Sequence, residues 1–113
     1  MKSWYVYIMA NKSNTVIYIG CTDDIEARVL EHKHKVYKNS FTAKYYCNKL
    51  VYFEEFHNGL EASKREKQMK KWKRAWKNDL IEDMNPSWMD ISLNWSYNIN
   101  TVYKTKRFLP TQE

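Results

Sequence analysis

Residues 4–21 of this 113-residue chain read WYVYIMANKSNTVIYIGC, and this stretch decides the fold. Two runs of aromatic and β-branched residues, 4–9 and 16–21, flank the polar segment 10–15, a pattern typical of a β-hairpin. If the turn centres on Lys12 and Ser13, Tyr7 lies directly opposite Tyr18 and on the same face. A slip of one residue would separate the pair, so this prediction depends on the register.

The segment after the hairpin has the features of a helix. Asp23 is followed three residues later by Glu26, a capping box that predicts a helix start. This helix should end near Lys33. Arg28 and His32 are four residues apart, so they share one face of it.

The rest of the chain reads as a loop, a strand and two helices. Residues 33–49 form a lysine-rich stretch that we expect to be a loop, and residues 50–56 read as a third strand. A long helix is predicted over residues 60–77 and a short one over residues 79–83, ahead of Pro86. The long helix begins an apolar stripe that we expect to lie in the core: Met69, Trp72, Trp76 and Leu80.

The chain length favours one compact domain. We place this domain at residues 1–91 and treat residues 92–113 as a C-terminal extension of unknown role. Within the extension, residues 97–103 could supply a strand.

The positive charge is concentrated in one segment. The chain has 19 Lys and Arg against 13 Asp and Glu, a net charge of +6. Residues 60–77 contain eight bases and two acids, and the remaining residues are balanced. A clustered basic surface indicates a polyanionic partner such as nucleic acid.

Several classes of protein are excluded by the same sequence. No apolar stretch approaches the roughly 20 residues that span a bilayer, and no export signal is recognisable at the N-terminus. We therefore expect a cytoplasmic protein without membrane contact, in which Cys21 and Cys47 stay reduced. These cysteines and the nearby His32 and His34 lack the paired spacing of a structural zinc site.

The ordered set of motifs resembles the GIY-YIG nuclease family. The motifs are Tyr5-Val6-Tyr7, Tyr18-Ile19-Gly20, Arg28 with His32, Glu61-Ala62, and the run from Arg65 to Trp72. The resemblance covers about residues 4–91 and is nearest to the small single-domain bacterial branch, related to the incision domain of the excision-repair nuclease. Tyr5-Val6-Tyr7 stands where that family has Gly-Ile-Tyr. The resemblance implies an α+β fold, with a small three-stranded antiparallel sheet flanked by helices.

The resemblance also implies metal-dependent hydrolysis of phosphodiester bonds, most naturally in DNA. In-line attack on a phosphodiester builds negative charge on the phosphoryl oxygens, so the site must supply cations. Mg²⁺ or Mn²⁺ is the implied cofactor, and Mg²⁺ often takes only one or two protein carboxylates. Glu66 is the implied metal ligand and the only acid between Ala62 and Asp79. The alternative for Glu66 is an exposed ion pair with Lys70, worth about 0.3–0.5 kcal/mol.

Four further residues receive catalytic roles from the resemblance. Arg28 would contact the scissile phosphate with two N–H groups; the alternative is a surface pair with Asp24 or Glu31. Tyr7 is the candidate general base, and Tyr18 would position the attacking water or share its proton. Their alternative is simple cross-strand packing. For His32, a role in orienting water or phosphate and a packing role remain equally open.

The remaining predicted site residues are backbone positions and lysines that would contact phosphates. Gly20 is expected where the backbone or the substrate approaches closely, and Asn85 either corresponds to a late asparagine of the family or caps a turn. Phosphate contacts would come from Lys33, Lys35, Lys64, Lys67, Lys70 and Lys71. Such contacts set affinity without reading sequence, which predicts structure-dependent or weakly sequence-specific cleavage. The alternative function is a non-catalytic module that binds DNA or RNA.

Overall fold

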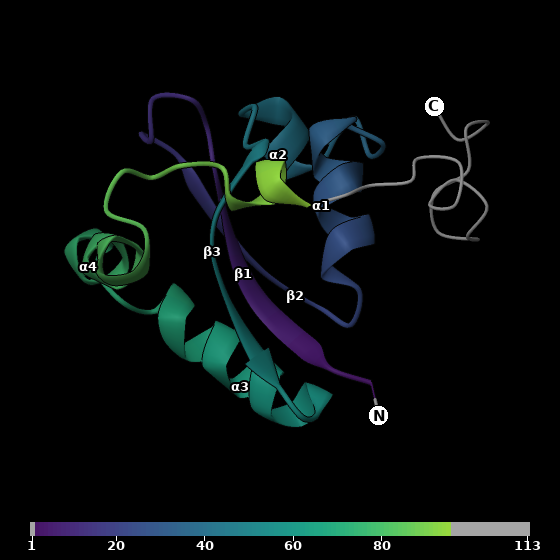
Figure 1. Cartoon of the computed structure of the whole chain (residues 1–113), viewed down its shortest axis with the longest axis vertical. Coiled ribbons are helices and arrows are strands. Elements are labelled where there is room, and N and C mark those ends of the chain that lie inside the picture. Colours follow the sequence, from purple (N-terminus) through teal and green to yellow (C-terminus); the bar gives the residue numbers. More distant parts are fainter. Residues whose placement is uncertain (1, 96–113) are drawn as a thin grey trace.

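A three-stranded antiparallel sheet forms the centre of the structure, a computed structural model that describes residues 2–95 (Figure 1). The strand order is β2-β1-β3, and helices lie on both faces, which confirms the predicted α+β fold. The elements are β1 (Trp4–Ala10), β2 (Ile17–Thr22), α1 (Ile25–Lys33), α2 (Phe41–Lys44), β3 (Lys49–Phe56), α3 (Gly59–Lys70), α4 (Arg74–Met84) and the short 3₁₀ helix η1 (Ile91–Asn94).

The central strand β1 separates two hydrophobic clusters. Its even-numbered residues Val6 and Ile8 pack beneath α3 and α4, together with Met69 and Ile81. Its odd-numbered residues Tyr7 and Met9 face the other way, toward α1 and η1. This alternation follows from the two-residue period of a strand. Figure 1 shows α3 on one face of the sheet and α1 on the other.

The register of the hairpin differs from the predicted one by two residues. Tyr7 pairs with Gly20 and Met9 pairs with Tyr18, so the prediction that Tyr7 lies directly opposite Tyr18 is wrong. The turn centres one residue later because Asn14 adopts a left-handed conformation with φ 61°, which asparagine tolerates better than most residues. A shift of two residues preserves the face, so Tyr7 and Tyr18 still lie on the same side of the sheet.

Two boundaries in the segment after the hairpin also differ. The N-cap of α1 is Asp24, whose carboxylate accepts from the Ala27 N–H at 3.2 Å, whereas the predicted cap Asp23 pairs with Lys2. The expected loop over residues 33–49 contains α2, which begins after an N-cap, Ser40. Serine is a typical N-cap, but four helical residues are too few to show a periodic pattern.

The predicted helix over residues 60–77 is in fact two helices, α3 and α4, separated by residues 71–73. The short helix expected over residues 79–83 is the second half of α4. A tertiary contact lies at the start of α4, where the Arg74 guanidinium donates to the carbonyl oxygens of Asn14 and Thr15 in the hairpin loop, at 2.6 and 3.0 Å. Of the apolar stripe expected in the core, Met69 is buried and Trp72 and Leu80 pack against the core, but Trp76 is 52% exposed.

The last described residues lie against the sheet. Helix η1 begins after Asp90, whose carboxylate accepts from the Leu50 N–H at 3.2 Å. The possible strand over residues 97–103 lies outside the described residues, and the division of the chain at residue 91 stays a prediction. Within residues 2–95, no helix is both long enough and apolar enough to span a membrane.

Candidate active site

The Tyr7 hydroxyl is the centre of the candidate site. Tyr7 lies on the central strand and is fully buried. Its hydroxyl oxygen lies 2.9 Å from Nε2 of His32, and the Arg28 side chain forms a second hydrogen bond to it. The Tyr18 ring lies 6.2 Å from the Tyr7 ring, between their centroids. The structure therefore brings together four of the predicted catalytic residues, Tyr7, Tyr18, Arg28 and His32.

Gly20 makes room for this cluster. A Cβ atom at position 20 would lie 2.5 Å from both Cζ and Oη of Tyr7, and 2.9 Å from Cε2 of Tyr18. The register explains this contact, since Gly20 is the direct cross-strand partner of Tyr7. The close approach expected at Gly20 is thus made by the tyrosine itself.

Burial and neighbouring groups set the charge states in the cluster. Burial raises the pKa of Tyr7 well above its ordinary value, Tyr18 raises it further, and Arg28 opposes both effects. Burial and the positive charge of Arg28 lower the pKa of His32 to about 4. At neutral pH the cluster therefore holds a protonated Tyr7 and a neutral His32.

Thr42 is a contact of the cluster that the sequence did not reveal. Its Oγ1 lies 2.7 Å from Nδ1 of His32, on the side of the ring opposite Tyr7. Thr42 is buried in α2, next to the N-cap Ser40. Because residues 33–49 read as a loop, no pattern connected Thr42 with His32.

Glu31 supports Arg28 from within α1. Its carboxylate lies 3.0 Å from Nε of Arg28, one of the two alternatives considered for this arginine. The pair is not a solvated surface contact, however, because the Glu31 side chain is only 2% exposed. With Nε 3.0 Å from the Glu31 carboxylate and another contact to Tyr7, the guanidinium is held on the cluster while one third of its side chain remains exposed.

Glu66 lies on the other face of the sheet, near the same edge. Its carboxylate pairs with Nζ of Lys70 at 3.0 Å, which is the ion pair considered as its alternative role. Burial is the largest cause that raises the pKa of the Cys21 thiol. The negative charge of Glu66 raises this pKa further, and the positive charge of Arg28 lowers it. Glu66 and Arg28 thus act on one residue of β2, adjacent to Gly20.

The single carboxylate of Glu66 suits Mg²⁺ or Mn²⁺ better than it suits a metal ion held by several protein ligands. Within residues 2–95, no group of three or more His, Cys, Asp or Glu side chains could hold a metal ion. A single partly exposed carboxylate suits Mg²⁺, which keeps several waters and completes its shell with substrate phosphate. Glu66 would have to exchange Lys70 for the metal.

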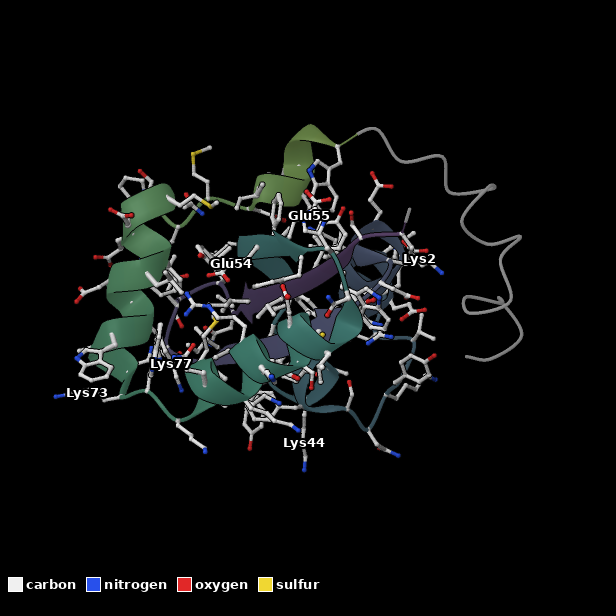
Figure 2. The ribbon with its side chains drawn as sticks, turned by 90° about the horizontal axis from the view of Figure 1, so that it is seen from below. Lys2, Lys44, Glu54, Glu55, Lys73 and Lys77 are labelled. Carbon is white, nitrogen blue, oxygen red and sulfur yellow. The ribbon has the colours of Figure 1, made fainter. Side chains whose placement is uncertain are left out.

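The lysines are distributed unevenly around the sheet. The α3 lysines among the predicted phosphate contacts are exposed, whereas Lys33 pairs with Asp90 and Lys35 lies over the Tyr46 ring. Figure 2 shows Lys44 and Lys77 on the β2 side of the molecule, away from Glu54 and Glu55 on β3. Lys44 and Lys77 therefore lie on the side of the sheet where β2 carries Tyr18.

A shallow cavity of about 370 Å³ lies elsewhere, between Tyr5, Phe53 and the start of α1, and a smaller one adjoins Tyr18. The smaller cavity has a volume of about 290 Å³ and is lined by Ile17, Tyr18, Ile19, Phe41, Lys70 and Lys77. We regard the smaller cavity as part of the site, because it shares Tyr18 with the cluster and Lys70 with Glu66.

Asn85 has a structural role in this chain. Its amide donates to the carbonyl oxygens of Val51 and Met89, at 3.0 and 2.8 Å, and its Oδ1 accepts from the Met89 N–H. These contacts satisfy the side chain, and they connect the end of α4 to β3. The geometry thus favours the turn role considered for Asn85.

Comparison with known proteins finds one family model and several similar proteins. Residues 3–79 match a family model described as the GIY-YIG catalytic domain. The chain is 41% identical over 81 residues to a UPF0213 protein of Clostridium perfringens, covering 68% of this chain and 81% of the relative. It is 38% identical to a UPF0213 protein of Syntrophus aciditrophicus, covering 79% and 100%. A solution NMR structure of a UPF0213 protein from Bacillus halodurans matches with a TM-score of 0.48 and 24% identity, covering 83% of this chain and 99% of that chain.

Proposed function

The chain belongs to the GIY-YIG catalytic-domain family, and on this premise we propose that it is a metal-dependent endonuclease that hydrolyses DNA phosphodiester bonds. The observation that supports the proposal most is the buried Tyr7 hydroxyl, which is held between His32 and Arg28 beside Tyr18. A purely structural tyrosine needs one hydrogen-bond partner. Tyr7 has several, and two of them can carry or receive protons.

Tyr7 would act as the general base. Its proton first leaves toward Tyr18, which is partly exposed and can pass it to solvent. The resulting phenolate oxygen, stabilised by Arg28, then takes a proton from the attacking water. The hydroxide forms a bond to phosphorus, the bond to the leaving oxygen breaks, and that oxygen is protonated from solvent.

Arg28 and Glu66 would bind and stabilise the scissile phosphate. The N–H groups of Arg28 that do not contact Glu31 or Tyr7 can donate to the scissile phosphate. Glu66 would hold Mg²⁺ or Mn²⁺, which when bound supplies positive charge against the negative charge developing on the phosphoryl oxygens. Release of Lys70 from Glu66 would leave its ammonium group available to a neighbouring phosphate.

The specificity we propose is structure-dependent or weakly sequence-dependent. The β2 edge offers lysine side chains from α2, α3 and α4, and such side chains bind phosphates regardless of base sequence. Residues 2–95 form the sheet and the helices that cover it, and this part of the chain contains no separate domain that could read base sequence.

One observation favours a second candidate function, a module that binds DNA or RNA without cutting it. Glu66 is neutralised by Lys70, and Tyr7 is protonated at neutral pH, so neither is poised for chemistry before substrate and metal arrive. The two candidates differ in their dependence on metal.

A nicking assay separates them. Supercoiled plasmid and branched duplex are incubated with the protein in Mg²⁺, in Mn²⁺ or in chelator, and Glu66→Gln is compared with Glu61→Gln, an exposed acid on the same helix. We expect metal-dependent nicking that falls on the order of 10²–10³-fold in Glu66→Gln and is unchanged in Glu61→Gln. Binding that ignores both metal and Glu66, with no nicking, would support the second candidate.

A further inference from the structure

We propose that Thr42 is a positioning residue that holds His32 in the tautomer whose Nε2–H donates to the Tyr7 hydroxyl oxygen. The proposal deepens the proposed function, because it rests on Tyr7 as the base. Its direct consequence, the tautomer of His32, is a property of the protein alone and can be measured without substrate.

The two nitrogens of His32 have one partner each. Nδ1 lies 2.7 Å from Oγ1 of Thr42, and Nε2 lies 2.9 Å from Oη of Tyr7. A neutral imidazole has one N–H donor and one acceptor nitrogen. The role of Nδ1 toward Thr42 therefore decides the role of Nε2 toward Tyr7.

The surroundings of Thr42 favour it as the donor to Nδ1. The distances of 2.7 Å at Nδ1 and 2.9 Å at Nε2 both suit a hydrogen bond in either direction, so the second contact of the Thr42 hydroxyl sets the direction. On its other side, Oγ1 of Thr42 lies 3.3 Å from Oγ of Ser40, which itself accepts from the Ala43 N–H. The Ser40 proton can therefore be directed to Thr42, and the Thr42 proton to Nδ1.

The position of Thr42 is fixed by its surroundings. It is buried, so water does not compete for its hydroxyl group, and its carbonyl oxygen accepts from the Cys47 N–H at 2.9 Å. Helix α2 packs against α1 at this point. The short helix thus brings a single hydroxyl group to the rear of the His32 ring.

With this tautomer, the Tyr7 oxygen receives two N–H donors, from His32 and from Arg28. The ionisable groups that face Tyr7 are Tyr18 on β2 and Arg28 and His32 on α1, with Glu31 behind Arg28. Donors to an oxygen favour its charged form, so the pair opposes the effect of burial and lowers the cost of forming the phenolate. In the opposite tautomer, Nε2 of His32 would accept a hydrogen bond from the Tyr7 hydroxyl group and so keep Tyr7 protonated.

The test uses Thr42→Val, which keeps the shape of the side chain and removes the hydroxyl, and Thr42→Ser, which restores it. Ring ¹⁵N spectra of His32 identify the protonated nitrogen in the metal-free protein. We expect Nε2–H in the wild type and in Thr42→Ser, and a shift toward Nδ1–H in Thr42→Val. Nδ1–H in the wild type would overturn the proposal whether or not the protein is a nuclease.

Single-turnover pH–rate profiles give the functional readout. In Thr42→Val we expect the alkaline rise in rate to move up by about one pH unit, equivalent to about a tenfold lower rate at neutral pH, and to return to its place in Thr42→Ser. Thr22→Val, another buried threonine away from His32, controls for destabilisation and should leave the profile unchanged. Identical profiles for Thr42→Val and Thr42→Ser would refute the positioning role, whereas a wild type that does not cleave would refute the proposed function and leave the tautomer result standing.

Discussion

At the scale of single residues, the tightest constraint in the candidate site is the contact between Gly20 and the Tyr7 ring. The ring occupies the space that a side chain at position 20 would need. Both residues are on adjacent strands and neither can move without breaking the hairpin register. The position of the Tyr7 hydroxyl is therefore fixed by the backbone of β2 as well as by its hydrogen bonds.

Gly20→Ala tests this constraint. Because the added Cβ would overlap Cζ and Oη of Tyr7, we expect the free energy of unfolding to fall by about 1–3 kcal/mol and the nicking activity of the folded protein to fall with it. Chemical denaturation and the plasmid assay measure the two effects. Gly59→Ala is the control, since its Cβ would only approach the Trp4 ring at 3.0 Å, outside the site. Full activity in Gly20→Ala would show that the position of Tyr7 is unimportant.

His32 contributes to stability in a defined pH window. Its pKa is lowered from 6.5 to about 4 in the folded protein by burial and by Arg28. Between these values the unfolded chain binds a proton that the folded protein does not, so the contribution is complete above pH 6.5 and is lost as the pH falls toward 4. The loss is on the order of 3 kcal/mol.

His32→Gln should therefore unfold with a weaker pH dependence than the wild type. The measurement is denaturant unfolding at several values between pH 7 and pH 4, taken as the difference between the two proteins so that other acid-sensitive groups cancel. A constant difference across this range would contradict a buried, neutral His32.

Residue identity was sufficient to find most of the cluster from sequence. Tyr7, Tyr18, Arg28 and His32 stand at motif spacing, and the hairpin and the helix bring them together. Thr42 and the burial of Glu31 could not be predicted. Both depend on how α1 and α2 pack against each other, and a single threonine or glutamate carries no pattern of its own.

At the scale of elements, side-chain contacts at the end of a helix fix its position on the sheet. The end of α4 is attached to β3 through the Asn85 side chain. Asn85 makes three backbone hydrogen bonds from a buried position, so its removal leaves buried backbone groups without partners.

For Asn85→Ala we expect the free energy of unfolding to fall by about 2–3 kcal/mol, with unchanged activity per folded molecule. Thermal unfolding and nicking rates, measured below the transition, check the two expectations. A variant of native stability that had lost its activity would instead assign Asn85 to the site.

The element boundaries show which information is local. The strands and the extent of α1 could be predicted because their residue periodicity is local, although the N-cap of α1 is Asp24 and not Asp23. The break after α3 was not predicted, and the residue that begins α4, Arg74, contacts the hairpin loop about 60 residues earlier in the chain, a contact that no local pattern reveals.

At the scale of the whole molecule, exposed lysines lie on α3, and Glu54 and Glu55 lie on β3, the strand at the edge opposite β2. Figure 2 shows Lys44 and Lys77 apart from Glu54 and Glu55. A polyanion approaching α3 would meet its exposed lysines first.

Salt dependence of DNA binding tests this orientation. Lys67→Gln and Lys71→Gln remove exposed charges on α3 and at its C-cap, and each should lower the slope of log K against log salt by about 0.9 if the side chain contacts a phosphate. Lys2→Gln is the control, because Lys2 pairs with Asp23 away from this surface. Fluorescence anisotropy with a labelled duplex measures the slopes, and equal slopes for all three variants would argue against a binding surface on α3.

The central claim is that the Tyr7 hydroxyl takes the proton of the attacking water. Tyr7→Phe removes only this hydroxyl group from the buried ring, and its unfolding curve shows whether the fold is retained. In Mg²⁺, under single-turnover conditions, the account predicts that Tyr7→Phe cleaves DNA about 10²–10⁴-fold more slowly than the wild type while binding it equally well. Cleavage by Tyr7→Phe at the wild-type rate would contradict it.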